Sequence, residues 1–158
     1  MATIGQDLFT EGANTALASH TPDVGAGWTE ESAQWTVVAA QDNLRHNTTF
    51  TYMARKGDDI GDDDMDVSAS CKCAQASNRN SGVCGRMTTA DFDNAYQAYL
   101  QGDDATKVDL FLFSEISGVR VQLATYNADL TADTFATVKL EIRTAAKKVY
   151  LDGVERIS

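Results

Sequence analysis

The stretch MDVSASCKC, residues 65–73, alternates between apolar and polar side chains. Successive side chains of an extended strand point to opposite faces, so every second residue shares a face. One face of this stretch would hold Met65, Val67, Ala69, Cys71 and Cys73, and the other would hold the polar residues. The stretch therefore predicts a strand with one buried face.

The same period of two recurs in further segments bounded by clusters of Gly, Asn, Asp and Ser. They are TFTYMA (49–54), VDLFLF (108–113), VRVQLATY (119–126), TVKLEIR (137–143) and KVYLDG (148–153). Short alternating strands at this spacing are typical of an antiparallel sandwich or barrel. Asp152 and Gly153 predict a tight hairpin after the last segment, because glycine readily adopts the positive φ that such turns need.

The segment DFDNAYQAYLQ (91–101) fits two periods. Tyr96, Tyr99 and Leu100 are spaced as on one face of a short helix. The hairpin rhythm on both sides favours a strand, which is the interpretation that we adopt. The chain as a whole therefore predicts an all-β fold.

Composition limits both the domain organisation and the partners. The chain has 158 residues, of which 43% are hydrophobic, and we expect one domain spanning residues 1–158. Its net charge of −10 would repel a phosphate backbone, so nucleic acid is not an expected partner. No apolar run approaches the ~20 residues of a membrane span, and the N-terminus lacks the features of a secretion signal, so we expect neither a membrane nor export.

The three cysteines leave three alternatives open. Cys71 and Cys73 share a face of one predicted strand, and Cys84 follows a polar loop on the returning strand. Zinc would need a fourth ligand, and both histidines lie far upstream. A cross-strand disulfide is the second alternative. Buried free thiols, which pack as small hydrophobic groups, are the favoured interpretation.

An acidic run, GDDIGDDDMD (57–66), offers clustered carboxylates on one predicted loop. Calcium takes six to eight oxygen ligands, so a calcium site is one interpretation, but the spacing does not match an EF-hand. A solvated hairpin loop without metal is the favoured alternative. The candidate calcium ligands are Asp58, Asp59, Asp62, Asp63 and Asp64.

The motifs of common enzymes are absent from the sequence. It contains no GxSxG elbow, P-loop or HExxH segment. Its glutamates do not form the paired acidic alternation on one strand that would place two carboxylates across a glycosidic bond. We therefore expect no catalytic residues and a protein that is not an enzyme.

The opening third of the chain carries a resemblance to a known family. Phe9, Leu17, the run SHTPDVGAGW (19–28) and Trp35 follow one another in an order that resembles the start of concanavalin A-like, laminin G-type jelly rolls of bacteriophage structural proteins. The later segments DMDVSASC, GVCGRM, DFDNAYQAYL, TFATVKLEIR and KVYLDGV fit in the same order. The resemblance implies an antiparallel two-sheet jelly-roll sandwich of the concanavalin A-like type.

The resemblance also implies where the early residues lie and what the protein does. A strand containing Phe9 would pair near a sheet edge, and Trp28 and Trp35 would enter the core. Pro22 would stiffen the crossing segment between them. The implied function is that of a non-enzymatic virion protein, located on the virus particle as a capsid decoration or fibre component. Its partners would be other capsid or tail proteins.

The end of the chain suggests a further contact. Members of the family usually continue past a segment like KVYLDGV with strands that close the sandwich, so the chain is expected to lack its last closing strands. An open sheet edge invites strand addition. We therefore expect self-association or a lattice contact at this edge.

Aromatic side chains supply an alternative function, that of an adhesin that binds host-surface glycan. Ring faces pack well against the apolar surfaces of sugars. The candidate ligand contacts are Trp28, Tyr96 and Tyr99, although most aromatic residues of a sandwich belong to its core and no alternation is expected to place several on one exposed face. A glycan hydrolase is the weaker third hypothesis.

Overall fold

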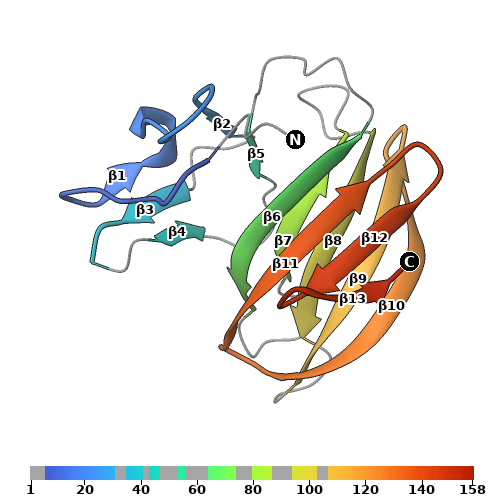
Figure 1. Cartoon of the computed structure of the whole chain (residues 1–158). Coiled ribbons are helices and arrows are strands. Elements are labelled where there is room, and N and C mark those ends of the chain that lie inside the picture. Colours follow the sequence, from blue (N-terminus) through green and yellow to red (C-terminus); the bar gives the residue numbers. More distant parts are fainter. Residues whose placement is uncertain are drawn as a thin grey trace. The chain divides into compact units, whose positions relative to one another are not determined.

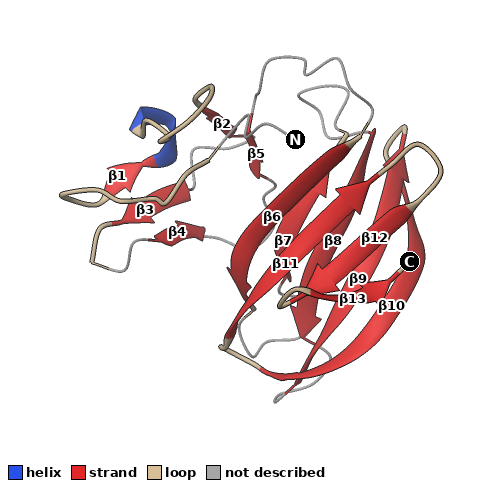
Figure 2. Cartoon of the chain, in the orientation of Figure 1, coloured by secondary structure: helices blue, strands red, loops and turns tan. Residues whose placement is uncertain are grey.

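The computed structural model describes residues 6–30, 35–40, 43–46, 53–55, 64–73, 80–86, 94–102 and 107–158. The chain divides into two compact units, Met1–Gly61 and Asp62–Ser158. Almost all regular structure in the described residues is strand, and the helical part is one 3-10 turn, η1 (Leu17–Ser19) (Figures 1 and 2). Within these residues no helix has the length and apolar character needed to cross a membrane.

The second unit is a sandwich of two antiparallel four-stranded sheets in its described part (Figure 1). The β7 sheet has the order β10-β9-β8-β7, and the β6 sheet has the order β13-β12-β11-β6. The strands of the β7 sheet are β7 (Asn80–Gly85), β8 (Asn94–Gly102), β9 (Lys107–Ile116) and β10 (Val119–Thr131). Those of the β6 sheet are β6 (Met65–Lys72), β11 (Phe135–Ile142), β12 (Lys147–Leu151) and β13 (Val154–Ile157).

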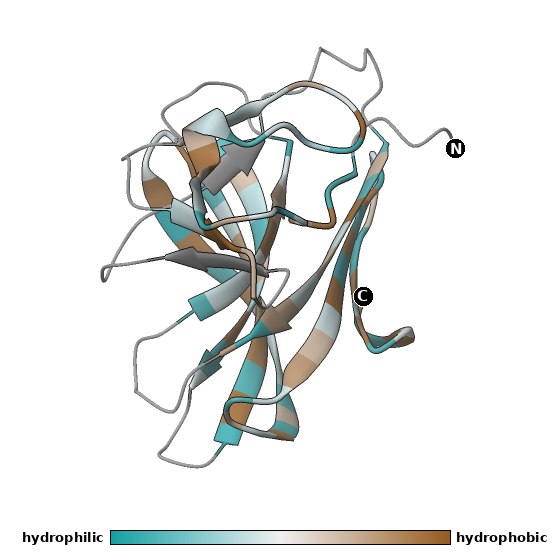
Figure 3. Ribbon diagram, turned by 90° about the vertical axis from the view of Figure 1, so that its left-hand side faces the viewer, coloured by the Kyte–Doolittle hydropathy of each residue, from teal (hydrophilic) through white to brown (hydrophobic). Residues whose placement is uncertain are grey.

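Alternate residues of both sheets form one hydrophobic core between them, as the banding of the strands in Figure 3 illustrates. β11 contributes Ala136, Val138, Leu140 and Ile142, each at most 3% exposed, and faces Ala98, Leu100, Leu110 and Leu112 of the other sheet. Burying apolar surface in this way stabilises the fold by roughly 25 cal/mol per Å². The all-β, antiparallel two-sheet jelly-roll sandwich predicted from the sequence is confirmed.

The individual strand predictions agree with this architecture. Residues 65–72 form β6, and the ambiguous segment 91–101 forms the strand β8 from Asn94 onward. Asp152 and Gly153 have φ values of 49° and 80° and join β12 to β13, as the hairpin signal predicts. The predicted strand 49–54 coincides with the described residues only at its end, where β5 begins with Met53.

The three cysteines form no disulfide with one another in the structure. Cys71 and Cys73 lie in the core, on the same face, as the alternation predicts. Burial raises the pKa of the Cys71 thiol to about 11, although a hydrogen bond with Ser81 opposes this shift. Burial also raises the pKa of Cys84 to about 11. Neither of these two thiols ionises near neutral pH, so neither is an activated nucleophile.

The first unit contains short strands: β1 (Thr15–Ala16), β2 (Trp28–Glu30), β3 (Trp35–Val38), β4 (Asn43–His46) and β5 (Met53–Arg55). They form two small antiparallel sheets, β1-β3-β4 and β2-β5. Leu17 and Val37 are fully buried in this unit. The division into two units leaves the expectation of one domain over residues 1–158 a prediction.

Three expectations for the early residues are wrong. Phe9 lies outside any strand, in the left-handed region with φ 54°, and the isolated bridge of this segment joins Gln6 to Val24 instead. Trp28 and Trp35 belong to strands of the first unit and are only half-buried. Neither tryptophan is among the buried residues of the sandwich core.

Candidate functional site

The outward side of the β7 sheet carries three aromatic rings in mutual contact. Tyr99 of β8 pairs across the ladder with Phe111 of β9, and Phe113 follows two residues along β9. The Tyr99 and Phe113 rings are nearly parallel, with centroids 5.2 Å apart. The Phe111 centroid lies 6.1 Å from that of Tyr99 and 6.0 Å from that of Phe113. These distances are those of favourable aromatic pairs.

Strand alternation places these rings on the outside of the sandwich. The neighbouring residues Leu110 and Leu112 are 0% and 3% exposed and belong to the core, so Phe111 and Phe113 point the other way. Ala98 and Leu100 bracket Tyr99 on β8 in the same manner. The three rings therefore lie on the outer side of the β7 sheet, where Phe111 and Phe113 are half-buried and Tyr99 is 6% exposed.

Arg120 of β10 lies across this cluster. Its guanidinium carbon is 4.3 Å from the centroid of Phe113 and 4.8 Å from that of Tyr99. One guanidinium nitrogen also donates a hydrogen bond to the Tyr99 hydroxyl. We call the set Tyr99, Phe111, Phe113 and Arg120 the aromatic face. Cation–π contact of this kind contributes about 0.5–1 kcal/mol at an exposed site.

A polar pair lies beside the aromatic face. The side-chain amide of Gln97 donates to Glu115 Oε2 at 2.7 Å. Gln97 is the cross-strand partner of Phe113, and Glu115 is the cross-strand partner of Arg120. Amide and carboxylate groups next to ring faces and a guanidinium can receive and donate hydrogen bonds to a polar ligand.

A glycine allows the strands under this face to approach closely. Gly82 of β7 pairs with Tyr99 of β8. A Cβ atom at position 82 would overlap the backbone of Ala98 and Tyr99. Position 82 therefore requires glycine for the observed spacing of β7 and β8.

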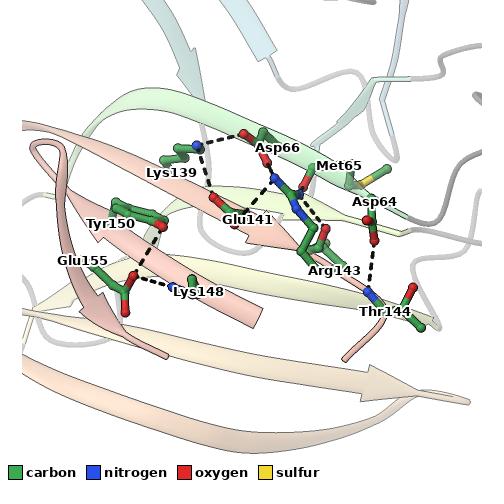
Figure 4. A network of polar contacts seen from close by, with 11 residues as sticks. Asp64, Met65, Asp66, Lys139, Glu141, Arg143, Thr144, Lys148, Tyr150 and Glu155 are labelled. Atoms are coloured by element: carbon green, nitrogen blue, oxygen red, sulfur yellow. Dashed lines mark hydrogen bonds and ion pairs between the residues drawn. The ribbon is translucent and has the colours of Figure 1, made fainter. Parts of the chain in front are cut away.

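The outward side of the β6 sheet has a different composition, a network of charged side chains (Figure 4). Lys139 and Arg143 of the β11 segment each contact Asp66 of β6 at 2.8 Å, and both lie 3.5 Å from Glu141. Lys148 of β12 forms a separate pair with Glu155 of β13 at 2.7 Å. We call the four residues of the first group the charged face. The charges of its two acidic and two basic side chains cancel.

The charged face also brings two carboxylates together, Asp66 and Glu141, which pair across β6 and β11. Burial would raise the pKa of Asp66, but hydrogen bonds from Lys139 and Arg143 outweigh it and leave this pKa below its ordinary value. A glycosidase needs one carboxylic acid that stays protonated near neutral pH. Asp66 has the opposite shift, so Asp66 does not meet this requirement.

The predicted ligand residue Trp28 lies in a third cluster, in the first unit. Its indole N–H donates to Asp7, and its ring centroid is 5.5 Å from that of Phe9. His20 contacts Asp7 through Nε2 at 2.8 Å and Glu11 through Nδ1 at 2.7 Å. Burial would lower the pKa of His20, but these two hydrogen bonds raise it overall. Trp28 thus helps to hold the opening segment together.

The other predicted site residues do not form one site. Tyr96 packs against the sandwich core, whereas Tyr99 points outward from the same strand, β8. Asp58, Asp59, Asp62 and Asp63 lie outside the described residues. Asp64 accepts a hydrogen bond from the backbone N–H of Thr144 at 3.0 Å. Within the described ranges, no three His, Cys, Asp or Glu side chains gather as metal ligands would.

Sequence reasoning missed Phe111, Phe113 and Arg120. Phe111 and Phe113 alternate onto the outer side of β9, where both are half-buried, so the expectation that no alternation places several aromatic residues on one exposed face stays a prediction. The signal was present: Asp109, Phe111, Phe113 and Glu115 alternate with an aliphatic set that begins at Val108. Two phenylalanines on the polar side of a strand indicate a surface cluster.

One solved structure carries this architecture. The carbohydrate-binding module CBM66 from Bacillus subtilis superposes on the chain with a TM-score of 0.64, over 84% of this chain and 78% of that one. The two sequences are 18% identical over the match, a level at which the likeness concerns the fold. No family model matches the chain, and no curated protein matches it.

Proposed function

We propose that this protein is a non-catalytic glycan-binding module whose ligand lies on the aromatic face. The observation that carries the proposal is the outward cluster of Tyr99, Phe111 and Phe113 with a guanidinium across it. Sandwich proteins normally place aromatic rings in the core, where burial stabilises the fold. The half-buried rings of Phe111 and Phe113 on an outer face, beside the exposed Arg120, therefore suggest a surface kept for a ligand.

The chemistry of this surface suits a sugar. A pyranose ring has an apolar side of C–H groups that packs on an aromatic face, and a rim of hydroxyls that needs hydrogen-bond partners. Phe111 and Phe113 supply ring surface. The Glu115 carboxylate, held by the buried Gln97 amide, and the Arg120 guanidinium supply acceptors and donors beside it.

The solved structure of similar fold adds support, because its name describes a carbohydrate-binding module. The electrostatics support a function without catalysis. Asp66 and Glu141 of the charged face are engaged by two cations, and Glu115 on the aromatic face accepts a hydrogen bond from a neutral amide. The lowered pKa of Asp66 is the opposite of what a general acid needs to stay protonated.

Affinity electrophoresis of Phe111→Ala against a panel of polysaccharides tests the proposal. The panel combines neutral glucans, galactans and mannans with acidic polymers such as polygalacturonate. For a polymer that retards the wild type, Phe111→Ala should weaken binding about tenfold, because it removes one stacking ring. Loss of binding in this variant would place the ligand on the aromatic face.

Phe135→Ala is the matched control. Phe135 is an exposed phenylalanine on β11 of the other sheet, with the Lys72 ammonium 5.4 Å from its ring centroid. The control should bind like the wild type. Equal weakening in both variants, or no retardation by any polymer, would refute the proposal.

A second candidate function is that of a non-enzymatic virion protein, either a decoration or a glycan-binding adhesin on a phage particle. It rests on the order of Phe9, SHTPDVGAGW and Trp35 and the later segments that resemble phage jelly rolls. Its test is titration of the purified protein onto particles that lack it. Saturable binding at a fixed copy number is the expected result, and absence of binding would exclude decoration.

A further inference from the structure

We infer that the ligand of the aromatic face is an acidic glycan and that Arg120 binds its sugar carboxylate. This inference rests on the proposed function and names the ligand class of the same site. It follows from what Arg120 contacts. Its partners are the rings of Tyr99 and Phe113 and the Tyr99 hydroxyl, and within the described part of the chain it forms no ion pair.

Three other cations of the second unit differ in this respect. Lys139, Arg143 and Lys148 each contact a carboxylate at 2.7–2.8 Å. Arg120 has a carboxylate at its cross-strand position, Glu115, but that group instead accepts a hydrogen bond from Gln97. The Arg120 charge therefore remains available to an anion from outside.

The contacts of Arg120 with the rings leave it hydrogen-bond donors for such an anion. A guanidinium carries five N–H donors, and the Tyr99 hydroxyl occupies one of them. Arg120 is exposed, so its remaining N–H donors can reach a ligand. A planar guanidinium matches a carboxylate with two parallel hydrogen bonds, which a neutral hydroxyl cannot reproduce.

Phe111 completes the site for a sugar acid. It contacts both other rings, whereas the guanidinium stacks on Tyr99 and Phe113. One ring can thus receive the apolar side of a sugar while the neighbouring guanidinium receives the acid group. The net charge of −10 disfavours anions, but screening at physiological salt limits this repulsion to charges within about 8 Å of the ligand.

The test compares acidic polysaccharides with their carboxyl-reduced forms, which keep the same sugars without the charge. Polygalacturonate, alginate and hyaluronan are the acidic probes, and dextran sulfate is the control for charge alone. The wild type should bind at least one acidic probe about 10- to 100-fold more tightly than its reduced form, the range expected for a charge-assisted pair of hydrogen bonds. Binding should weaken as NaCl is raised.

Variants connect this preference to Arg120. Arg120→Gln should lose the preference and its salt dependence, and Arg120→Lys should retain part of both, because it keeps the charge but not the planar fork. Arg156→Gln is the matched control, since the Arg156 guanidinium lies 5.0 Å from the centroid of the Tyr126 ring and belongs to β13. It should bind like the wild type, and thermal melting of each variant verifies folding.

The outcomes separate this inference from the proposed function. Equal binding of acidic and reduced polymers, an unaltered preference in Arg120→Gln, or equal binding of dextran sulfate would overturn the acidic ligand while leaving a glycan-binding module intact. Absence of binding to every neutral and acidic polymer would overturn the proposed function, and the inference with it.

Discussion

The two outer faces of the sandwich are built on sheets of the same size but have opposite chemistry. On the β6 sheet, Asp66 and Glu141 are matched by Lys139 and Arg143, so each charge has a partner within the protein. On the β7 sheet, Tyr99 and Phe113 lie against the Arg120 guanidinium, which has no carboxylate partner in the described residues. A face whose charged side chains are all paired with one another indicates a structural role. A face with aromatic rings and an arginine that has no ion pair in the described residues indicates a ligand site.

The largest effect is expected from Gly82→Ala, under the aromatic face. The added methyl group would overlap the backbone of β8 at Ala98 and Tyr99, so the strands must separate. We expect a loss of about 2–3 kcal/mol in the free energy of unfolding, measured by urea denaturation, together with weaker glycan binding.

Gly27→Ala is its control, because a Cβ at that position meets no atom within 4 Å. Its stability should change by less than about 1 kcal/mol. A Gly82→Ala variant as stable as the wild type would show that β7 and β8 can move apart without cost, and that the aromatic face is less rigid than the comparison assumes.

A smaller effect is expected from Asp66→Asn on the charged face. The change removes the charge that Lys139 and Arg143 share, at a site where the Asp66 side chain is 29% exposed. The expected loss is about 1 kcal/mol in the free energy of unfolding, since partly exposed ion pairs contribute little. Glycan binding should not change. Weaker binding in this variant would contradict the assignment of separate roles to the two faces.

Acid should remove the same contribution from the wild type. The folded-state pKa of Asp66 is below its ordinary value of 3.8, because hydrogen bonds from Lys139 and Arg143 outweigh burial. Its stabilising contribution is therefore present above about pH 3.8 and is lost as the pH falls through the folded-state pKa. Urea denaturation from pH 6 to pH 2.5 should show the stability difference between wild type and Asp66→Asn shrinking below pH 4. A constant difference would exclude this linkage.

The smallest effect is expected from Lys148→Met. Its pair with Glu155 lies on the surface, where water and salt screen the attraction. The melting temperature by circular dichroism should stay the same, with or without added salt. A clear drop would mean that this pair is part of a larger cooperative network with the charged face.

The contrast between the faces also explains which features could be predicted from the sequence and which could not. The strands were predictable because one face of each is aliphatic: Met65 to Cys73 and the segment from Val108 give that period directly. Of the candidate site only Tyr99 was predicted. Tyr99 meets Phe111 only through the register of β8 on β9, and Arg120 reaches Phe113 and Tyr99 only because the β9–β10 hairpin places β10 beside β9. Alternation within one strand says which residues share a face, but not which strand lies beside it.

The predictions for Phe9, Trp28 and Trp35 were wrong for a related reason. Trp28 was expected in the sandwich core on the strength of its size, yet its indole N–H donates to Asp7 within a polar cluster around His20. The large apolar area of a tryptophan predicts burial. Its indole N–H, however, also needs a hydrogen-bond acceptor, and an acceptor far away in the sequence can determine where the side chain lies.

NMR mapping of the acidic polysaccharide fragment that binds most tightly would test the division of roles between the faces most directly. Titration should shift the resonances of Tyr99, Phe111, Phe113 and Arg120 while leaving those of Asp66, Lys139 and Tyr150 unchanged. Shifts concentrated on the charged face, or confined to residues outside both sheets, would contradict a glycan site on the aromatic face.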